Sequence, residues 1–166
     1  HDYRGFAGKI ASGIFKPRDS VIVLPSGFTT TIKTIESPQG EIDEAFPPMS
    51  VVMQLADDLD ISRGDMLVRP HNTPVISQDI DCMVCWMNTK PLNPGTRYII
   101  RHTTREIKGI IKEIQYKIDI NTLHRISEVT SLALNEIGRI TIRAAQPLFF
   151  DSYEHNRTTG SIILID

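Results

Sequence analysis

Cys82 and Cys85 form the single C-x-x-C spacing in the chain. In a cytosolic protein this spacing suggests either redox chemistry or a zinc site. Residues three apart on an extended strand point to opposite faces, so the two sulfur atoms are poorly placed to share a metal ion or a disulfide. The chain holds 2 cysteines, which leaves no second pair to complete a zinc site. We therefore expect packing or exposed cysteines and no bound metal.

The 5 histidines show neither H-x-x-x-H nor H-x-H spacing, so they predict no metal cluster. His102 follows Arg101 at the end of a predicted strand, and this pair is a candidate contact for a ligand or a partner. A surface histidine beside a basic residue can also be simply solvated, and that alternative stays open. The sequence has no serine elbow, and we predict no catalytic residue in this chain.

The sequence contains no G-x-x-x-x-G-K-[ST] motif, which holds the phosphates and the magnesium ion of a nucleotide. Gly5 to Lys9 lacks the spacing, and the next residue, Ile10, cannot bind magnesium. We expect this chain to bind neither GTP nor Mg²⁺ by itself and to carry no cofactor.

The composition, 40% hydrophobic and 23% charged, is typical of a folded, soluble protein. A formal net charge of -2 argues against nucleic acid or an anionic membrane as the main partner. No apolar run reaches the roughly 18 to 20 residues that a transmembrane helix needs, and no signal peptide is present, so we expect a cytoplasmic protein. The chain lacks an initiator methionine and stops directly after a strand-like segment, which suggests a piece of a longer polypeptide.

Residues 4–27 have the pattern of a β-barrel hairpin, because glycines punctuate a run that is rich in β-branched residues. Lys16-Pro17-Arg18-Asp19 is the turn between its strands. Pro17 presets φ at the first central position, and Arg18 disfavours the positive φ that a type II turn needs at the second. The residues therefore predict a type I turn.

Further short strands separated by turn signals predict an all-β fold. Val51, Met53 and Leu55 alternate with their neighbours and should share one buried face. Asn93-Pro94-Gly95-Thr96 predicts a type II turn. The expected strands cover residues 29–35, 50–55, 66–68, 79–87, 132–134, 139–145 and 161–165, and the second half also continues through residues 91–102, which include that turn.

Residues 106–118 are ambiguous, because their isoleucines recur at helical spacing and would line one face of a helix. Gly109 and five isoleucines disfavour a helix intrinsically. The same residues fit a strand if a bulge near Lys112 or Glu113 shifts the register. We predict a strand.

The proline-bracketed segment 69–74 is the expected domain boundary. It divides the chain into two tandem small β-barrels, residues 1–74 and residues 75–166.

Several stretches resemble the large, GTP-binding subunit of bacterial sulfate adenylyltransferase, a relative of elongation factor Tu. The first is the opening hairpin, RGFAGKIASGIFKPRDSVIVLPSG, in which that family usually has glycine at the position of Arg18. The others are DISRGDML at 60–67, LALNEIGR at 132–139 and DSYEHNRTTGSIILID at 151–166. The last is the most specific, because the elongation factors are not expected to share it.

The resemblance implies two β-barrels like domains 2 and 3 of elongation factor Tu. It further implies that the first barrel lacks its first strand and the second its last. In that family an N-terminal GTPase domain, which binds GTP and Mg²⁺, precedes the barrels. The whole subunit partners a smaller catalytic subunit that makes adenosine 5'-phosphosulfate from ATP and sulfate. The barrels would couple GTP hydrolysis to that reaction without catalysing it.

Asn156, Arg157 and Thr158 are the candidate interface residues that this reading favours, because a loop between strands can present a planar cation and hydrogen-bonding groups to a partner. The alternative is that Asn156 and Gly160 only satisfy turn geometry. A different reading of the whole chain makes it the barrel pair of a translation elongation factor that binds tRNA. A third makes it an autonomous scaffold.

Overall fold

The computed structural model describes residues 3–166, which form strands and loops and contain no helix. In this range no segment is a helix long and apolar enough to cross a membrane. The prediction of an all-β fold is confirmed. The chain forms two compact units. Unit 1 contains the residues up to Val75 together with Thr103–Arg105 and Phe149–Ser161, and unit 2 contains Ile76–His102, Glu106–Leu148 and Ile162–Asp166.

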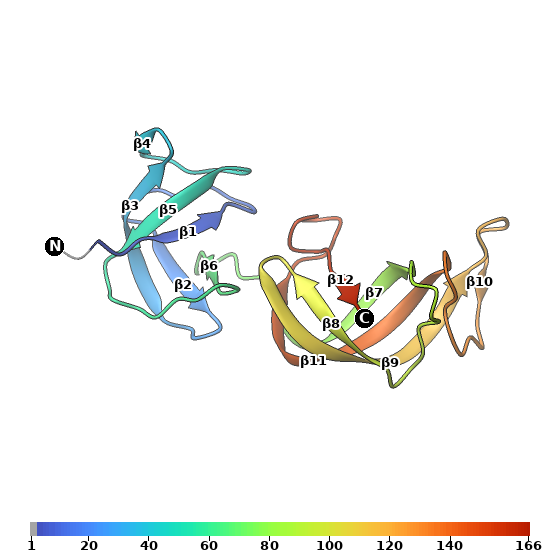
Figure 1. The fold of residues 1–166 in the computed structure, drawn as a ribbon. Helices are drawn as coiled ribbons and strands as arrows, with labels where there is room; N and C mark the ends of the chain where they lie inside the picture. Colours follow the sequence, from blue (N-terminus) through green and yellow to red (C-terminus); the bar gives the residue numbers. More distant parts are fainter. Residues whose placement is uncertain (1–2) are drawn as a thin grey trace. The chain divides into compact units, whose positions relative to one another are not determined.

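Unit 1 is built on an antiparallel sheet with the strand order β1-β5-β3-β2-β6, and β4 pairs with β3 (Figure 1). Val51, Met53 and Leu55 all point into its core, as their alternation predicts. Val21 and Ile32 from the neighbouring strands pack in the same cluster. The strands are β1 (Phe6–Lys9), β2 (Ser20–Leu24), β3 (Thr29–Ser37), β4 (Gly40–Glu41), β5 (Ser50–Leu55) and β6 (Met66–Val68).

The turn at Lys16–Asp19 corrects the type I prediction. Arg18 has a φ of 76°, and the Asp19 amide donates to the Lys16 carbonyl over 3.1 Å, so the turn is type II. Its surroundings explain why the preference of Arg18 is overruled. The Asp19 carboxylate accepts a hydrogen bond from the Lys16 amide (2.9 Å), and the Arg18 amide donates to the Ile32 carbonyl (2.8 Å).

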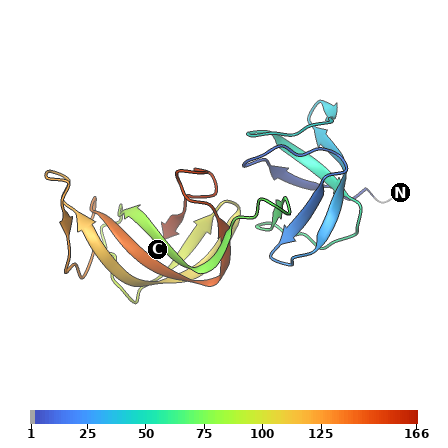
Figure 2. The ribbon, with the colours of Figure 1, turned by 180° about the vertical axis from the view of Figure 1, so that it is seen from behind.

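The strands of the second sheet follow the order β12-β8-β9-β11-β7, and β10 pairs with β9 (Figure 2). The interior of unit 2 is filled by aliphatic residues such as Ile100, Ile111 and Ile140, which are essentially inaccessible to solvent. The strands are β7 (Val75–Cys85), β8 (Arg97–His102), β9 (Arg105–Ile118), β10 (Arg125–Ile126), β11 (Ile137–Phe150) and β12 (Ile163–Ile165).

Residues 106–118 form a strand, as predicted, and lie within β9. The pairing of β9 with β11 shifts register twice, so that Lys112 and Gln115 are skipped on the β9 side. The first of these bulges lies where the prediction placed one. The bulges explain the helix-like spacing, because they keep Ile111 and Ile114, three residues apart, on the buried face of a strand.

One turn design recurs in both units. The Lys16–Asp19 and Ser62–Asp65 turns in unit 1 and the Ala133–Glu136 turn in unit 2 each place a positive φ at the third residue. In each, the carboxylate of the fourth residue accepts a hydrogen bond from the amide of the first, over 2.8 to 2.9 Å. The predicted strand over 132–134 is therefore wrong, because Leu132 makes a single bridge to Leu92 before the turn begins. The type II turn at Asn93–Thr96 is confirmed, with a φ of 83° at Gly95.

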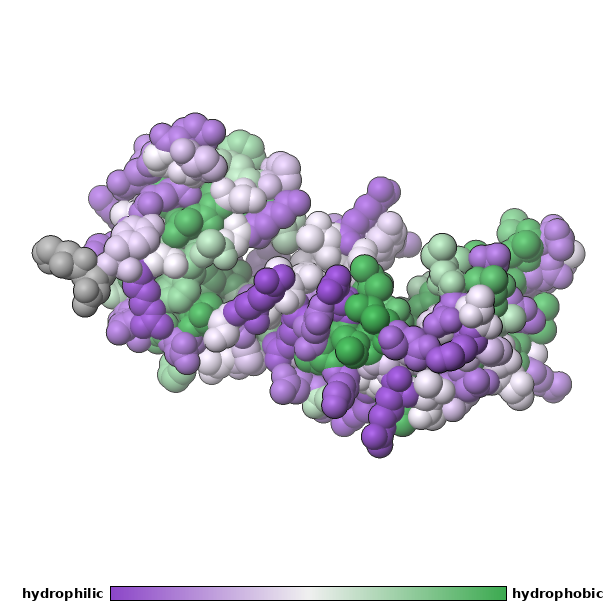
Figure 3. All heavy atoms as spheres, viewed as in Figure 1, coloured by the Kyte–Doolittle hydropathy of each residue, from purple (hydrophilic) through white to green (hydrophobic). Residues whose placement is uncertain are grey.

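Hydrophilic side chains cover most of the face seen in Figure 3, and hydrophobic side chains gather in a few patches. Several large apolar residues of unit 2 are exposed to solvent, among them Met87, Ile120, Leu123 and Ile163. Apolar groups that contribute nothing to a core are candidates for contacts with a partner.

Candidate protein interface

The loop 151–161, which holds the predicted interface residues, is a compact part of unit 1. The amides of His155 and Asn156 both donate to the Ser152 carbonyl over 3.0 Å, and the Gly160 amide donates to the Asn156 carbonyl over 2.8 Å. The Ser161 hydroxyl closes the loop on the Arg157 carbonyl (2.5 Å). The loop therefore has a fixed backbone on which side chains can be displayed.

Asn156 holds the loop together. Its side-chain oxygen accepts hydrogen bonds from the amides of Thr158 (3.0 Å) and Thr159 (3.4 Å), and its Nδ2 donates to the Ala11 carbonyl (3.3 Å). All three hydrogen bonds of the side chain thus serve the folding of unit 1. This geometry supports the alternative in which Asn156 satisfies the turn.

Thr159 and Gly160 complete this internal support. The Thr159 side chain is buried, and its Oγ1 lies 2.7 Å from Oδ2 of Asp151. A Cβ on Gly160 would come within 2.5 Å of the Tyr153 Cα, so no larger residue fits there without moving the backbone. Asp151 and Tyr153 were not predicted as site residues. The one signal for Tyr153 was its position four residues before Arg157.

Among Asn156, Arg157 and Thr158, Arg157 is the residue that exposes a charged group to solvent. Its guanidinium lies over the ring of Tyr153 at 5.8 Å from the ring centre, and Tyr153 is itself 56% exposed. Arg157 forms no ion pair within the described residues 3–166. An exposed arginine stacked on an exposed tyrosine is a combination enriched at the centres of protein interfaces.

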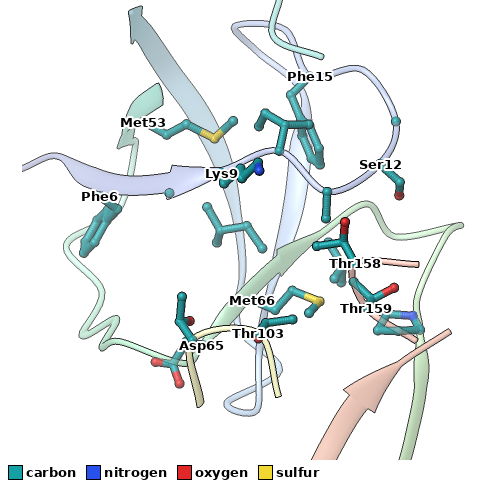
Figure 4. A pocket seen from close by; sticks show the side chains of 18 of the residues that line it. Phe6, Lys9, Ser12, Phe15, Met53, Asp65, Met66, Thr103, Thr158 and Thr159 are labelled. Atoms are coloured by element: carbon teal, nitrogen blue, oxygen red, sulfur yellow. The ribbon is translucent and has the colours of Figure 1, made fainter. Parts of the chain in front are cut away.

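A groove of about 880 Å³ in unit 1 runs between β1 and β6, the two strands at the ends of the sheet path. Phe6, Met53 and Met66 give it apolar walls, and Thr158 and Thr159 line it from the side of the 151–161 loop (Figure 4). Thr158 thus lies at the groove, while Arg157 does not line it.

Arg101 and His102 do not form a joint site. The Arg101 side chain is exposed, and its Nε donates to the Glu106 carboxylate over 2.7 Å. His102 is 2% exposed, which contradicts the expectation that it lies at the surface. The physical reason is the two-residue period of β8, which places His102 on the buried face with Tyr98 and Ile100. That alternation was readable in the sequence and would have predicted its burial.

The two cysteines are both free, with Cys82 half-buried and Cys85 exposed, as opposite faces of β7 require. Burial, followed by the nearby charge of Asp81, raises the pKa of the Cys82 thiol to about 12. In the part of the chain that the structure describes, no group of three or more histidine, cysteine, aspartate or glutamate side chains is arranged to hold a metal ion.

Residues 79–166 match the family model described as GTP-eEF1A C-terminal domain-like. The chain belongs to this family. The match begins within β7 and covers the remaining strands of the second sheet and the loop 151–161.

Two homologous proteins match almost the whole chain. The bifunctional enzyme CysN/CysC of Mycobacterium tuberculosis (strain CDC 1551 / Oshkosh) is 51% identical over 166 residues, which are 99% of this chain and 27% of that protein. Sulfate adenylyltransferase subunit 1 of Bacteroides fragilis (strain YCH46) is 45% identical over 165 residues, which are 99% of this chain and 34% of that protein. The resemblance to the large subunit of bacterial sulfate adenylyltransferase is confirmed. The chain spans between 27% and 34% of the length of these relatives.

Solved structures agree on the fold. A crystal structure of Sup35 complexed with GMPPNP matches with a TM-score of 0.85 at 18% identity, covering 96% of this chain and 40% of that one. The apo form of translation elongation factor SelB from Methanococcus maripaludis matches with a TM-score of 0.69 at 19% identity, over 87% of this chain and 32% of that one. At this identity the likeness concerns the fold alone.

Proposed function

We propose that this chain is the β-barrel region of a GTP-binding large subunit of sulfate adenylyltransferase. In this proposal a smaller subunit catalyses the reaction of ATP with sulfate to adenosine 5'-phosphosulfate and pyrophosphate, in the cytoplasm. The barrels couple a GTPase domain to that subunit. The observation that carries the proposal is the identity of 51% and 45% with two relatives over 99% of the chain.

In this assignment the chain transmits a conformational state and does not catalyse. GTP and Mg²⁺ do not fit its residues, because the sequence lacks the phosphate-binding loop that would hold them. They belong in the GTPase domain of the parent subunit. GTPase switch loops are ordered by the bound triphosphate and released on hydrolysis, and a rigid neighbouring domain converts that local change into a movement.

The groove between β1 and β6 has a structural role in this proposal. Within residues 3–166, β1 pairs with β5 and β6 pairs with β2, and each leaves one strand edge facing the groove. A strand from outside these residues would fill the groove and close the first barrel, as the resemblance implies. Exposed strand edges readily accept such an addition.

Arg157 on Tyr153 is the contact that the loop 151–161 offers to a protein partner. Asn156, Thr159 and Gly160 hold the loop in shape, as described above, and Arg157 is left free to bind a carboxylate or a backbone carbonyl. Thr158 lines the groove and would contact the strand that fills it.

The proposal is tested with the parent subunit and its smaller partner in an assay of pyrophosphate release from ATP and sulfate. We expect GTP to stimulate the release when the parent subunit is present. We expect the 166-residue chain alone neither to hydrolyse GTP nor to release pyrophosphate. Adenylyl transfer by the isolated chain would overturn the proposed division of labour.

A further inference from the structure

The groove in unit 1 is bounded by two strand edges that run in the same direction. Neighbouring strands pair antiparallel along the path from β1 through β5, β3 and β2 to β6. Four antiparallel pairings therefore separate β1 from β6, and the two strands point the same way. A single strand laid between them in the opposite direction would be antiparallel to both edges and would close the sheet into a barrel.

The backbone groups of β1 follow the alternation of an antiparallel pair. The Ile10 amide donates to the Met49 carbonyl over 2.9 Å, and the register places the backbone of Gly8, two residues earlier, on the same side toward β5. The amides and carbonyls of Ala7 and Lys9 consequently point away from β5. Both residues are exposed and line the groove, so they offer a hydrogen-bonding edge to a further strand.

The inward face of β1 has an empty position at Gly8. Phe6 and Ile10, two residues before and after it, contribute to the core cluster of unit 1, so position 8 faces the same interior. Apart from its chain neighbours, no atom of the described residues lies within 4 Å of the place where a Cβ on Gly8 would be. Met53 of the core lines the same groove (Figure 4). The space beside Gly8 can therefore receive an apolar side chain from a strand in the groove.

The loop 151–161 limits how far such a strand can extend along β1. Ala11 continues the alternation of Ala7 and Lys9, so its carbonyl also points away from β5. This carbonyl accepts the hydrogen bond from Nδ2 of Asn156 over 3.3 Å. The Asn156 side chain thus takes the place of the next backbone partner, and a strand in the groove can pair with Ala7 and Lys9 but not with Ala11.

The groove excludes a strand that already belongs to another sheet. Both bounding edges are parts of one sheet, so the strand between them needs both of its own edges free. Each strand that the structure describes is already paired on at least one edge, so a second copy of this chain cannot supply it. A free segment of the same polypeptide meets the requirement, and its covalent link gives it a high effective concentration at the groove. The relatives have length for such a segment, since this chain spans 27% and 34% of them.

We propose that the segment that comes before residue 1 in the parent polypeptide closes unit 1, with its register set by Gly8 and Asn156. β1 is the first strand of the described chain, and an antiparallel strand that precedes it joins it through a short turn. The segment alternates apolar and polar residues and turns one large apolar side chain toward Gly8. It begins level with Lys9, because the bond from Asn156 prevents pairing beyond that point. This inference rests on the proposed function, which supplies the longer parent polypeptide.

The test compares hydrogen exchange of single amides in the 166-residue chain and in the full parent subunit. Ala7 and Lys9 should exchange at least about 100-fold more slowly in the parent, because a strand pairs with them only there. The Gly8 amide faces β5 and should be protected in both proteins, which makes it the internal control. The Ala11 amide, beyond the limit set by Asn156, should exchange equally in both.

Gly8→Val fills the space that the inward side chain of the segment needs. It should raise the melting temperature of the 166-residue chain by about 2 °C, because glycine weakens a strand and valine suits one. In the parent subunit the same change should reduce the protection of Ala7 and Lys9 at least about tenfold, since the added side chain competes with the segment. Protection that Gly8→Val leaves unchanged would mean that another part of the parent covers this edge, and would overturn the proposal.

Equal exchange of Ala7 and Lys9 in the two proteins would overturn the closing strand, whatever the pyrophosphate assay shows. Protection of both amides in the 166-residue chain that is lost on dilution would assign the groove to a second copy and would also overturn the proposal. Slower exchange of Ala11 in the parent would contradict the register set by Asn156. Failure of GTP to stimulate pyrophosphate release, with Ala7 and Lys9 protected in the parent, would contradict the coupling role and support the closing strand.

Discussion

At the scale of single residues, Arg18 shows how a turn can require a conformation that its residue disfavours. Its side chain is exposed, and its φ of 76° is held by hydrogen bonds from the surrounding backbone and from Asp19. A non-glycine residue in this region is strained by roughly 1 to 2 kcal/mol, and glycine relieves that strain. Glycine also has greater freedom in the unfolded chain, which offsets part of the gain.

We therefore expect Arg18→Gly to raise the free energy of unfolding by about 0.5 to 1 kcal/mol. Thermal unfolding followed by circular dichroism measures the change. The matched control is Gly95→Arg, because Gly95 has a φ of 83° at the same position of the Asn93–Thr96 turn and nothing lies within 4 Å of its Cβ position. This control should lower stability by a similar amount. A less stable Arg18→Gly protein would mean that the arginine side chain makes a stabilising contact of its own.

The two cysteines should differ in reactivity, since the thiolate is the reactive form. Burial raises the pKa of Cys82 to about 12, so its thiol stays protonated at pH 8. Iodoacetamide at pH 8 should alkylate the exposed Cys85 and leave Cys82 unmodified, as read by mass spectrometry of peptides. Unfolding in guanidinium chloride should make both react. Equal alkylation of the two in the folded chain would contradict the burial of Cys82.

At the scale of elements, an ion pair links two neighbouring strands on the exposed face of the second sheet. Arg139 on β11 binds Asp81 on β7 through both carboxylate oxygens, each over 2.8 Å. These bonds to Arg139 are the largest cause that lowers the pKa of Asp81 from its ordinary value of 3.8. The stability that a carboxylate with a lowered pKa contributes is present above its unfolded pKa and is lost as the pH falls through its folded pKa.

Asp81→Asn should consequently lower the melting temperature at pH 7 and flatten its fall below about pH 4. The pair is partly exposed, so the loss at pH 7 should be about 1 kcal/mol or less. Melting curves from pH 7 to pH 2 measure both effects. Asp43→Asn is the control, because Asp43 forms no ion pair within residues 3–166. Parallel pH profiles for Asp81→Asn and the original chain would show that the Asp81–Arg139 pair does not contribute to the fall of the melting temperature in acid.

Sequence reasoning worked for elements where one local signal agreed with the sheet. The alternation of Val51, Met53 and Leu55 predicted β5, and β-branching predicted β9 in spite of helical spacing. Sequence reasoning failed where a contact between residues far apart in the sequence determined the structure. The type of the Lys16–Asp19 turn depends on a bond to Ile32, and Leu132 forms its bridge with Leu92, a residue far away in the sequence.

The candidate site was predictable to a similar degree. Arg157 was identified as a cation on a loop, but its stacking on Tyr153 depends on the folded loop. Asn156 carried two alternatives, and its three side-chain hydrogen bonds within unit 1 support the one based on turn geometry.

At the scale of the whole molecule, the proposed account divides the work between proteins. In that account one subunit would carry the GTPase domain and these two barrels, and the smaller subunit would carry out adenylyl transfer. The account requires that the barrels be present for GTP to act on the smaller subunit.

The decisive measurement is the rate of GTP-stimulated pyrophosphate release by the smaller subunit. It is made with the intact parent subunit and with a parent subunit from which the segment that forms this 166-residue chain is deleted. GTP hydrolysis by each parent, measured in parallel, verifies that the GTPase domain is active in both. The account predicts that the shortened parent still hydrolyses GTP and no longer stimulates pyrophosphate release. Undiminished stimulation without these residues would contradict the claim that they transmit the state of the GTPase.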